Sequence, residues 1–185
     1  MLFRSLFNID FKNIQGENCI FGDKVLEYIQ YRYPFMDVGS IHDNMDPETN
    51  LYEGQTLMDV WEFAKNRPGQ VVIYYHSKGV LSASPHSKQW RDFLTQTLVT
   101  DWRIRQKEFE YFQPDVMGCT DQAAMNDGKN IMSGNFWWAT TDYIATLPEP
   151  NYTDRYAYED WIMLNNPRVH VVNHIPVNPY EEYIL

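Results

Sequence analysis

Hydrophobic residues recur along the chain with two different periods, and these periods distinguish helices from strands. Within "TLMDVWEFAKNRPG", the apolar positions have the i, i+3, i+4, i+7 spacing of one helix face. These positions are Leu57, Val60, Trp61 and Ala64. Pro68 and Gly69 end this amphipathic helix, because neither residue favours its continuation. The β-branched and aromatic run "VVIYY" at 71–75 follows directly and predicts a buried strand.

The rest of the chain continues the alternation. Ser87 can cap a helix with one apolar face, formed by Trp90, Phe93, Leu94 and Leu98, and a second helical stretch is predicted to about Phe112. Strand or strand-like segments are predicted at "PDVMG" (114–118), "SGNFWWA" (133–139) and "VHVV" (169–172), and helices at "TTDYIATL" (140–147) and "YEDWIML" (158–164). The segment 34–52 is rich in turn-forming residues and is predicted to be a loop. This order favours an α/β fold with a mixed central sheet flanked by helices.

Composition narrows the function classes. A chain of 185 residues without internal repeats or linkers is interpreted as a single domain, 1–185. Its net charge of -10 argues against broad binding of nucleic acid or anionic membranes, so an anionic ligand needs a local cationic pocket. Cys19 and Cys119 lack the spacing of a metal site or a disulfide framework. No apolar run reaches the ~20 residues of a membrane span, and no signal peptide is recognisable, which predicts a soluble, cytoplasmic protein.

Polar and cationic residues follow the predicted strand 71–75 directly, as His76, Ser77, Lys78 and Gly79. In open α/β sheets, ligands bind beyond the carboxyl ends of the strands. A glycine permits close approach of the backbone, a lysine is a compact cation suited to phosphate oxygens, and a histidine can donate a hydrogen bond. The group therefore predicts a diphosphate site, although a solvated loop lysine beside a strand-end histidine is the simpler alternative.

The motifs "YYHSKGV", "QWRDF", "PDVMG", "SGNFWWATTDYIATLP" and "DRYAYEDWIM" occur in that order between residues 53 and 175. Together they resemble a family of nucleotide-sugar-dependent glycosyltransferases with a GT-A-like fold, found in bacterial polysaccharide clusters and large DNA viruses. The resemblance implies transfer of a sugar from a nucleotide diphosphate sugar to a hydroxyl of a glycan-type acceptor. Residues 1–52 match weakly, which suggests that the chain lacks the first strand and helix of such a domain.

Many GT-A enzymes hold a divalent metal on an Asp-x-Asp motif, and this sequence contains none. We therefore expect fixed side chains to stabilise the leaving diphosphate, with Lys78 and Arg91 as its cations and His76, Ser77 and Gly79 beside them. No metal ligand is assigned. Mn²⁺ or Mg²⁺ stays open as a cofactor, for which the candidate ligands are Asp115, Asp121, His170 and His174.

The segment "SGNFWWA" suits a carbohydrate pocket. Indole faces stack on sugar rings while amide and hydroxyl groups bind their hydroxyls, so the predicted sugar-binding residues are Ser133, Gly134, Asn135, Trp137 and Trp138. Because neighbouring side chains on a strand point to opposite faces, one tryptophan is expected to face the sugar and the other the core.

The adjacent acids Glu159 and Asp160 are predicted to open a helix, where the helix dipole favours negative charge. A carboxylate here could accept the proton of the acceptor hydroxyl, so the candidate catalytic residues are Glu159 and Asp160, with Glu159 as the candidate general base. An ordinary acidic pair at a helix N-terminus is the simpler alternative. The alternative function is a non-catalytic carbohydrate-binding or assembly module derived from a truncated transferase. A third hypothesis, an α/β domain with an unrelated phosphate ligand, gains support if both tryptophans belong to the core.

Overall fold

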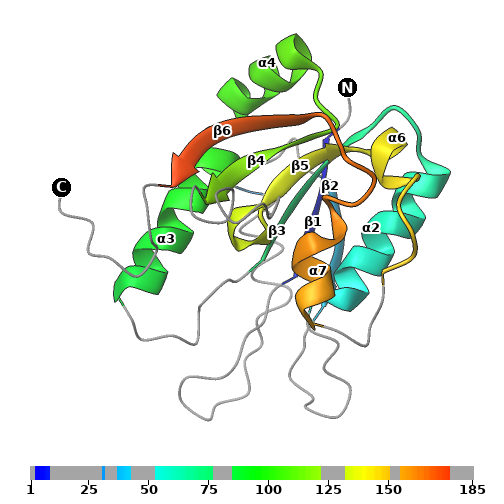
Figure 1. The fold of residues 1–185 in the computed structure, drawn as a ribbon, viewed down its shortest axis with the longest axis horizontal. Coiled ribbons are helices and arrows are strands. Elements are labelled where there is room, and N and C mark those ends of the chain that lie inside the picture. The colour runs from blue at the N-terminus through cyan, green and yellow to red at the C-terminus, as the bar shows by residue number, and fades with distance from the viewer. Residues whose placement is uncertain are drawn as a thin grey trace.

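The structure, a computed structural model of the chain, describes residues 3–8, 31, 37–42, 53–76, 85–121, 132–150 and 155–175. Their central element is a six-stranded mixed sheet with the strand order β2-β1-β3-β5-β4-β6 (Figure 1). The strands are β1 (Phe3–Asn8), β2 (Asp37–His42), β3 (Val71–His76), β4 (Val116–Asp121), β5 (Trp137–Thr140) and β6 (Val169–Ile175). The predicted α/β class and mixed sheet are confirmed.

Among the described strands, only β5 runs antiparallel to both its neighbours. β1 pairs in parallel with both β2 and β3, β5 pairs antiparallel with β3 and β4, and β6 pairs in parallel with β4. β3 therefore lies in the interior of the sheet, as its continuous apolar run predicted. The chain first adds β2 on one side of β1 and then β3 on the other side. The direction of winding thus changes between β1 and β3.

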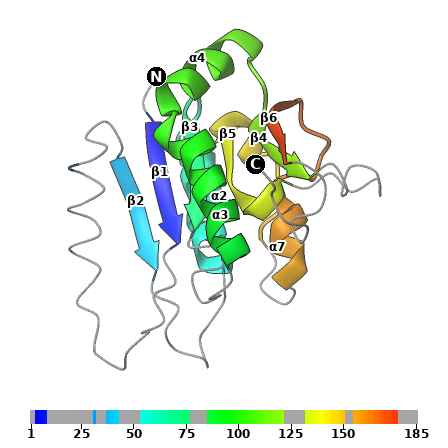
Figure 2. The ribbon, with the colours of Figure 1, turned by 90° about the vertical axis from the view of Figure 1, so that its left-hand side faces the viewer.

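Two strands near the N-terminus correct the interpretation of the sequence. Residues 3–8 form β1 in the middle of the parallel region, where no strand was predicted (Figure 2). β2, the outermost strand beside it, lies inside the segment 34–52 that was predicted to be a loop. The local sequence "DVGSIH" has few apolar residues, and its strand conformation depends on pairing with β1.

One face of the sheet is covered by α2 (Gly54–Asn66), α6 (Thr141–Ile144) and α7 (Arg155–Trp161). The helix face predicted from the sequence is buried in α2, where Leu57, Val60 and Ala64 are at most 2% exposed. These side chains share a core cluster with Tyr74 and Trp137 of the sheet. Burial of apolar area of this kind is the main source of stability, at about 25 cal/mol per Å².

The other face is covered by α3 (Pro85–Thr95) and the π-helix η1 (Gln96–Thr100), which lead into α4 (Trp102–Phe112). Figure 1 shows α3 and α2 on opposite sides of the sheet. Leu94 and Leu98 pack here against Cys119 and Phe136. The backbone carbonyl of Leu98 accepts a 2.8 Å hydrogen bond from the indole Nε1 of Trp138, which ties η1 to the sheet.

Helix boundaries differ from the prediction at three places, one of which is α6 (Thr141–Ile144), which is shorter than the predicted helix 140–147. α3 begins at Pro85 rather than after Ser87. The earlier start is explained by proline, which fits the first turn of a helix. α7 begins at Arg155 and ends at Trp161, so it starts earlier than the "YEDWIML" segment suggested. Among the described residues, no helix has the length and apolar character needed to cross a membrane.

Candidate functional site

The carboxyl ends of β1 and β3 lie next to each other. Asn8, the last residue of β1, pairs in register with His76, the last residue of β3. In open α/β sheets, a crevice for ligands forms where the winding direction changes, outside the carboxyl ends of the strands. The residues predicted to bind a diphosphate therefore begin at the carboxyl end of β3, next to the end of β1. Ser77, Lys78, Gly79 and the side chain of His76 lie outside the described residues, so their arrangement stays a prediction, and Arg91 is half-buried on α3.

The predicted sugar segment begins with a tight turn at the same end of the sheet. Ser133–Asn135 form the 3-10 turn η2, which leads into the antiparallel strand β5. Gly134 has a φ of +68°, and a Cβ atom at this position would lie 2.6 Å from Cδ1 of Leu94 on α3. The backbone conformation therefore favours glycine, and an added Cβ would also crowd the end of the Leu94 side chain. The side chain of Ser133 lies outside the described residues.

Replacement of Gly134 by alanine should lower the free energy of unfolding by about 2–4 kcal/mol, because a left-handed backbone and an overpacked contact are both unfavourable. Gly69 provides the control. Its φ is +71°, but no atom lies within 4 Å of the added Cβ, so Gly69→Ala should cost only about 1–2 kcal/mol. Denaturant unfolding measures both variants. Equal losses would contradict the close packing of η2 against α3.

Asn135 is the centre of a buried hydrogen-bond network. Its side chain is 1% exposed, and its Oδ1 accepts a 2.8 Å bond from Nε1 of Trp137. Its Nδ2 donates to the carboxylate of Glu53 and lies 3.5 Å from the carbonyl oxygen of Tyr158. The amide thus uses both donors and an acceptor lone pair inside the protein. The predicted contact of Asn135 with a sugar is not supported, because the side chain is enclosed.

Trp137 and Trp138 point to opposite faces of the sheet, as predicted for neighbours on a strand. Both are 0% exposed. The ring of Trp137 stacks on Tyr74 with 4.8 Å between centroids, and Trp138 packs on the other face, where it donates to Leu98. The prediction that one tryptophan faces a sugar is wrong for this structure, because both indoles are core residues with their N–H groups hydrogen-bonded.

Glu53 joins the Asn135 network, although no sequence pattern identified it as a site residue. It occupies the N-cap position of α2 and is half-buried, and its Oε2 lies 3.4 Å from the hydroxyl of Tyr74. Burial, together with the negative charge and the hydrogen bond of Glu53, raises the pKa of Tyr74 well above its usual value. Tyr74 therefore stays protonated and donates to the carboxylate.

Glu159 and Asp160 lie in the last turn of α7 rather than in its first. The helix dipole therefore disfavours their charges, and the electrostatic argument made from the sequence is wrong. Glu159 is half-buried and Asp160 is exposed. The preceding residue, Tyr158, approaches Asn135 through its carbonyl oxygen, so this turn of α7 lies beside the 3-10 turn η2.

The candidate metal ligands do not converge within the described part of the chain. There, no group of three or more His, Cys, Asp or Glu side chains is placed to bind a metal ion. His170 stacks on Phe112 and lies 3.8 Å from the carboxylate of Glu108, so it packs against α4. Asp115 is engaged by Arg168. The side chains of Asp121 and His174 lie outside the described residues.

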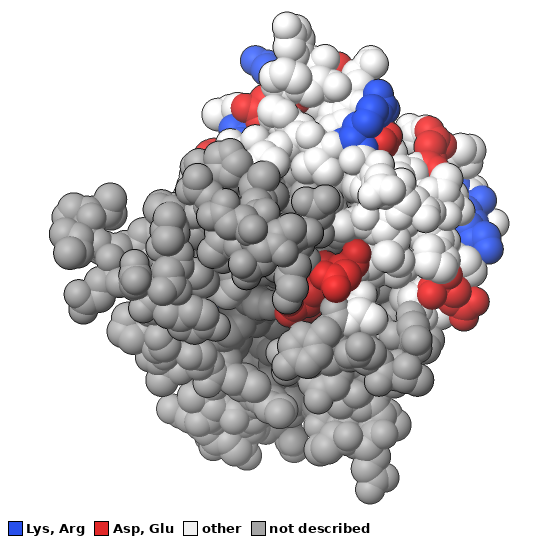
Figure 3. All heavy atoms as spheres, viewed as in Figure 1, with Lys and Arg blue, Asp and Glu red and all other residues white. Residues whose placement is uncertain are grey.

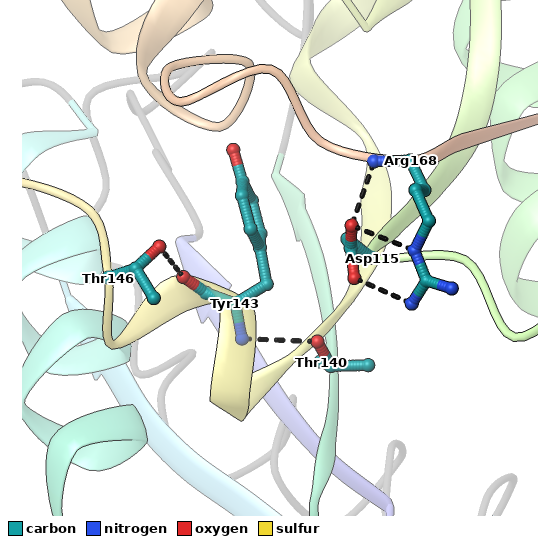
Figure 4. A network of polar contacts seen from close by, with 5 residues as sticks. All are labelled: Asp115, Thr140, Tyr143, Thr146 and Arg168. Carbon is teal, nitrogen blue, oxygen red and sulfur yellow. Dashed lines mark hydrogen bonds and ion pairs between the residues drawn. The ribbon is translucent and has the colours of Figure 1, made fainter.

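An open pocket of about 650 Å³ lies at the opposite end of the sheet from His76. It contains the ion pair of Asp115 and Arg168, which precede β4 and β6, and the hydroxyl of Thr140 at the end of β5 (Figure 4). Hydrogen bonds from Arg168, whose Nη2 lies 3.1 Å from Oδ1, hold the pKa of Asp115 below its usual value. Burial raises the pKa of Tyr143 in the same wall, and the charge of Asp115 adds to this effect.

The charges on the surface agree with a local rather than a general anion site. On the face drawn in Figure 3, the described basic and acidic side chains are both scattered, with one acidic group near the middle. The net charge of -10 also disfavours general binding of anions by the whole chain. A phosphate ligand would therefore depend on a few specific cations.

The chain belongs to the family described as Domain of unknown function (DUF8361), whose profile matches residues 36–160. The matched segment includes the predicted diphosphate group, the 3-10 turn η2 and both acids of α7. No curated protein and no solved structure matches the chain.

Proposed function

We propose that this member of the DUF8361 family is a glycosyltransferase that moves a sugar from a nucleotide diphosphate sugar to a hydroxyl of a glycan-type acceptor. The observation that supports it most is the position of His76 at the carboxyl end of an interior strand, in register with the end of β1. That is where α/β sheets bind nucleotides. A mixed sheet flanked by helices is also compatible with a GT-A-like domain.

The proposed chemistry follows from the residues beyond the end of β3. Lys78 stabilises the negative charge that develops on the leaving diphosphate, and His76 donates a hydrogen bond to it. Arg91 on α3 is the second candidate cation. Glu159 accepts the proton of the acceptor hydroxyl if the enzyme inverts the anomeric centre. In this proposal Mn²⁺ or Mg²⁺ remains an alternative to the fixed cations.

The alternative of a non-catalytic carbohydrate-binding or assembly module stays open. The burial of Trp137 and Trp138 bears on a different alternative, because it takes away the predicted stacking platform for a sugar. It favours, as the second candidate function, an α/β domain that binds a different phosphate ligand at the end of β3.

The test is a panel of nucleotide sugars, scored by thermal stabilisation of the chain and by hydrolysis or transfer. At least one donor should stabilise the protein in the presence of EDTA. Lys78→Ala should weaken that binding by about 1.5–3 kcal/mol, the range for a hydrogen bond to a charged group, while Lys107→Ala on the exposed side of α4 should not.

Two outcomes would contradict this version. Binding that is lost in EDTA and restored by Mn²⁺ would replace the fixed cations with a metal. Stabilisation by inorganic phosphate or simple phosphate esters, with none by any nucleotide sugar, would favour the second candidate function.

A further inference from the structure

Glu53 occupies a helix N-terminus without using its side chain to cap the helix. At the N-cap position of α2, a side-chain oxygen normally accepts a bond from a backbone N–H of the first turn. The carboxylate of Glu53 makes no such bond, and it is directed instead to Asn135, 82 residues away in the chain. Its position is therefore set by tertiary contacts with the 3-10 turn η2 and β3.

The other described residues of the Glu53 network are almost completely buried. Asn135, Tyr74 and Trp137 are at most 1% exposed, and Tyr158 is 2% exposed. Glu53 itself is half-buried, so among these described residues it is the most accessible to a ligand. The buried amide and phenol orient the carboxylate, and the structure thereby fixes an acidic group at a surface.

The location is the ligand-binding end of the sheet. Tyr74 pairs with Trp137 near the carboxyl end of β3, and β5 begins there because it runs antiparallel. α2 follows the parallel strand β2 and so begins at this same end. The carboxylate therefore lies on the side of the sheet where β3 ends in His76.

We propose that Glu53 is a further binding residue, whose carboxylate accepts hydrogen bonds from hydroxyl groups of the donor sugar; this inference rests on the glycosyltransferase function proposed above. An ionised carboxylate is an acceptor only, so it selects ligand groups that donate. Sugar hydroxyls are such donors, whereas a diphosphate is repelled by the same charge. Glu53 thus takes the role that the sequence suggested for Asn135, and Asn135 positions it.

The test compares two ligands on one variant. Glu53→Gln keeps the size of the side chain and an oxygen acceptor but removes the charge. We expect its dissociation constant for the nucleotide sugar to rise about tenfold or more, because the hydrogen bonds from the sugar are then made to a neutral acceptor instead of a charged one. Binding of the corresponding nucleoside diphosphate should stay unchanged or become tighter. Glu62→Gln, an exposed position on the same helix, controls for the change in net charge.

The outcomes separate this inference from the proposed function. If the wild-type chain binds no nucleotide sugar, the glycosyltransferase proposal fails. If it binds one and Glu53→Gln binds it equally well, or loses both ligands in parallel, the assignment of Glu53 is wrong. Should Glu53→Gln not fold, Glu53→Asp, which keeps the charge and withdraws it by one methylene, must show the same selective loss. Failure of both variants to fold would make Glu53 a structural residue only.

Discussion

Replacement of Trp137 by alanine is expected to lower the free energy of unfolding by about 3–5 kcal/mol, the range for removing a fully buried large aromatic side chain. The ring is 0% exposed and stacks on Tyr74, with an angle of 15° between their planes. The variant therefore leaves a cavity in the core. It also removes the 2.8 Å hydrogen bond to Oδ1 of Asn135.

Trp137→Phe separates the two contributions. It keeps an aromatic ring against Tyr74 but loses the N–H donor, so it should cost less than the alanine variant. Denaturant unfolding gives both values. A small loss of stability for Trp137→Ala, combined with complete loss of sugar binding, would reverse the conclusion that this indole belongs to the core and would restore its predicted contact with a ligand.

The elements predicted correctly are those determined by their own local pattern. α2 has a regular helix face, and its buried residues Leu57, Val60 and Ala64 are among those predicted from the spacing. β3 is a continuous apolar run with a polar end, and it is an interior strand. In both cases the periodicity of burial is already present in the sequence.

The missed elements depend on partners far away in the chain. β2 has little apolar character and is a strand because β1 pairs with it. The contact of Glu53 with Asn135 joins residues 82 positions apart, and no local pattern contains it. For the two tryptophans, the sequence predicted that they point to opposite faces of the sheet. Whether each face is buried depends on α2 and η1, which cover the two faces and are distant in the chain.

The remaining prediction concerns Glu159. As a general base it would contribute about 10²–10⁴-fold to the rate and little to donor binding, so Glu159→Gln should reduce turnover by that factor and leave donor affinity nearly unchanged. Its position supports a site role, because the neighbouring Tyr158 contacts Asn135 at the end of the sheet that carries His76.

The control is Glu149→Gln, which removes the same charge from an exposed residue outside α7 and should leave turnover unchanged. The measurement is steady-state kinetics with whichever donor the panel identifies, together with donor binding by calorimetry. Turnover that survives in Glu159→Gln would exclude it as the base.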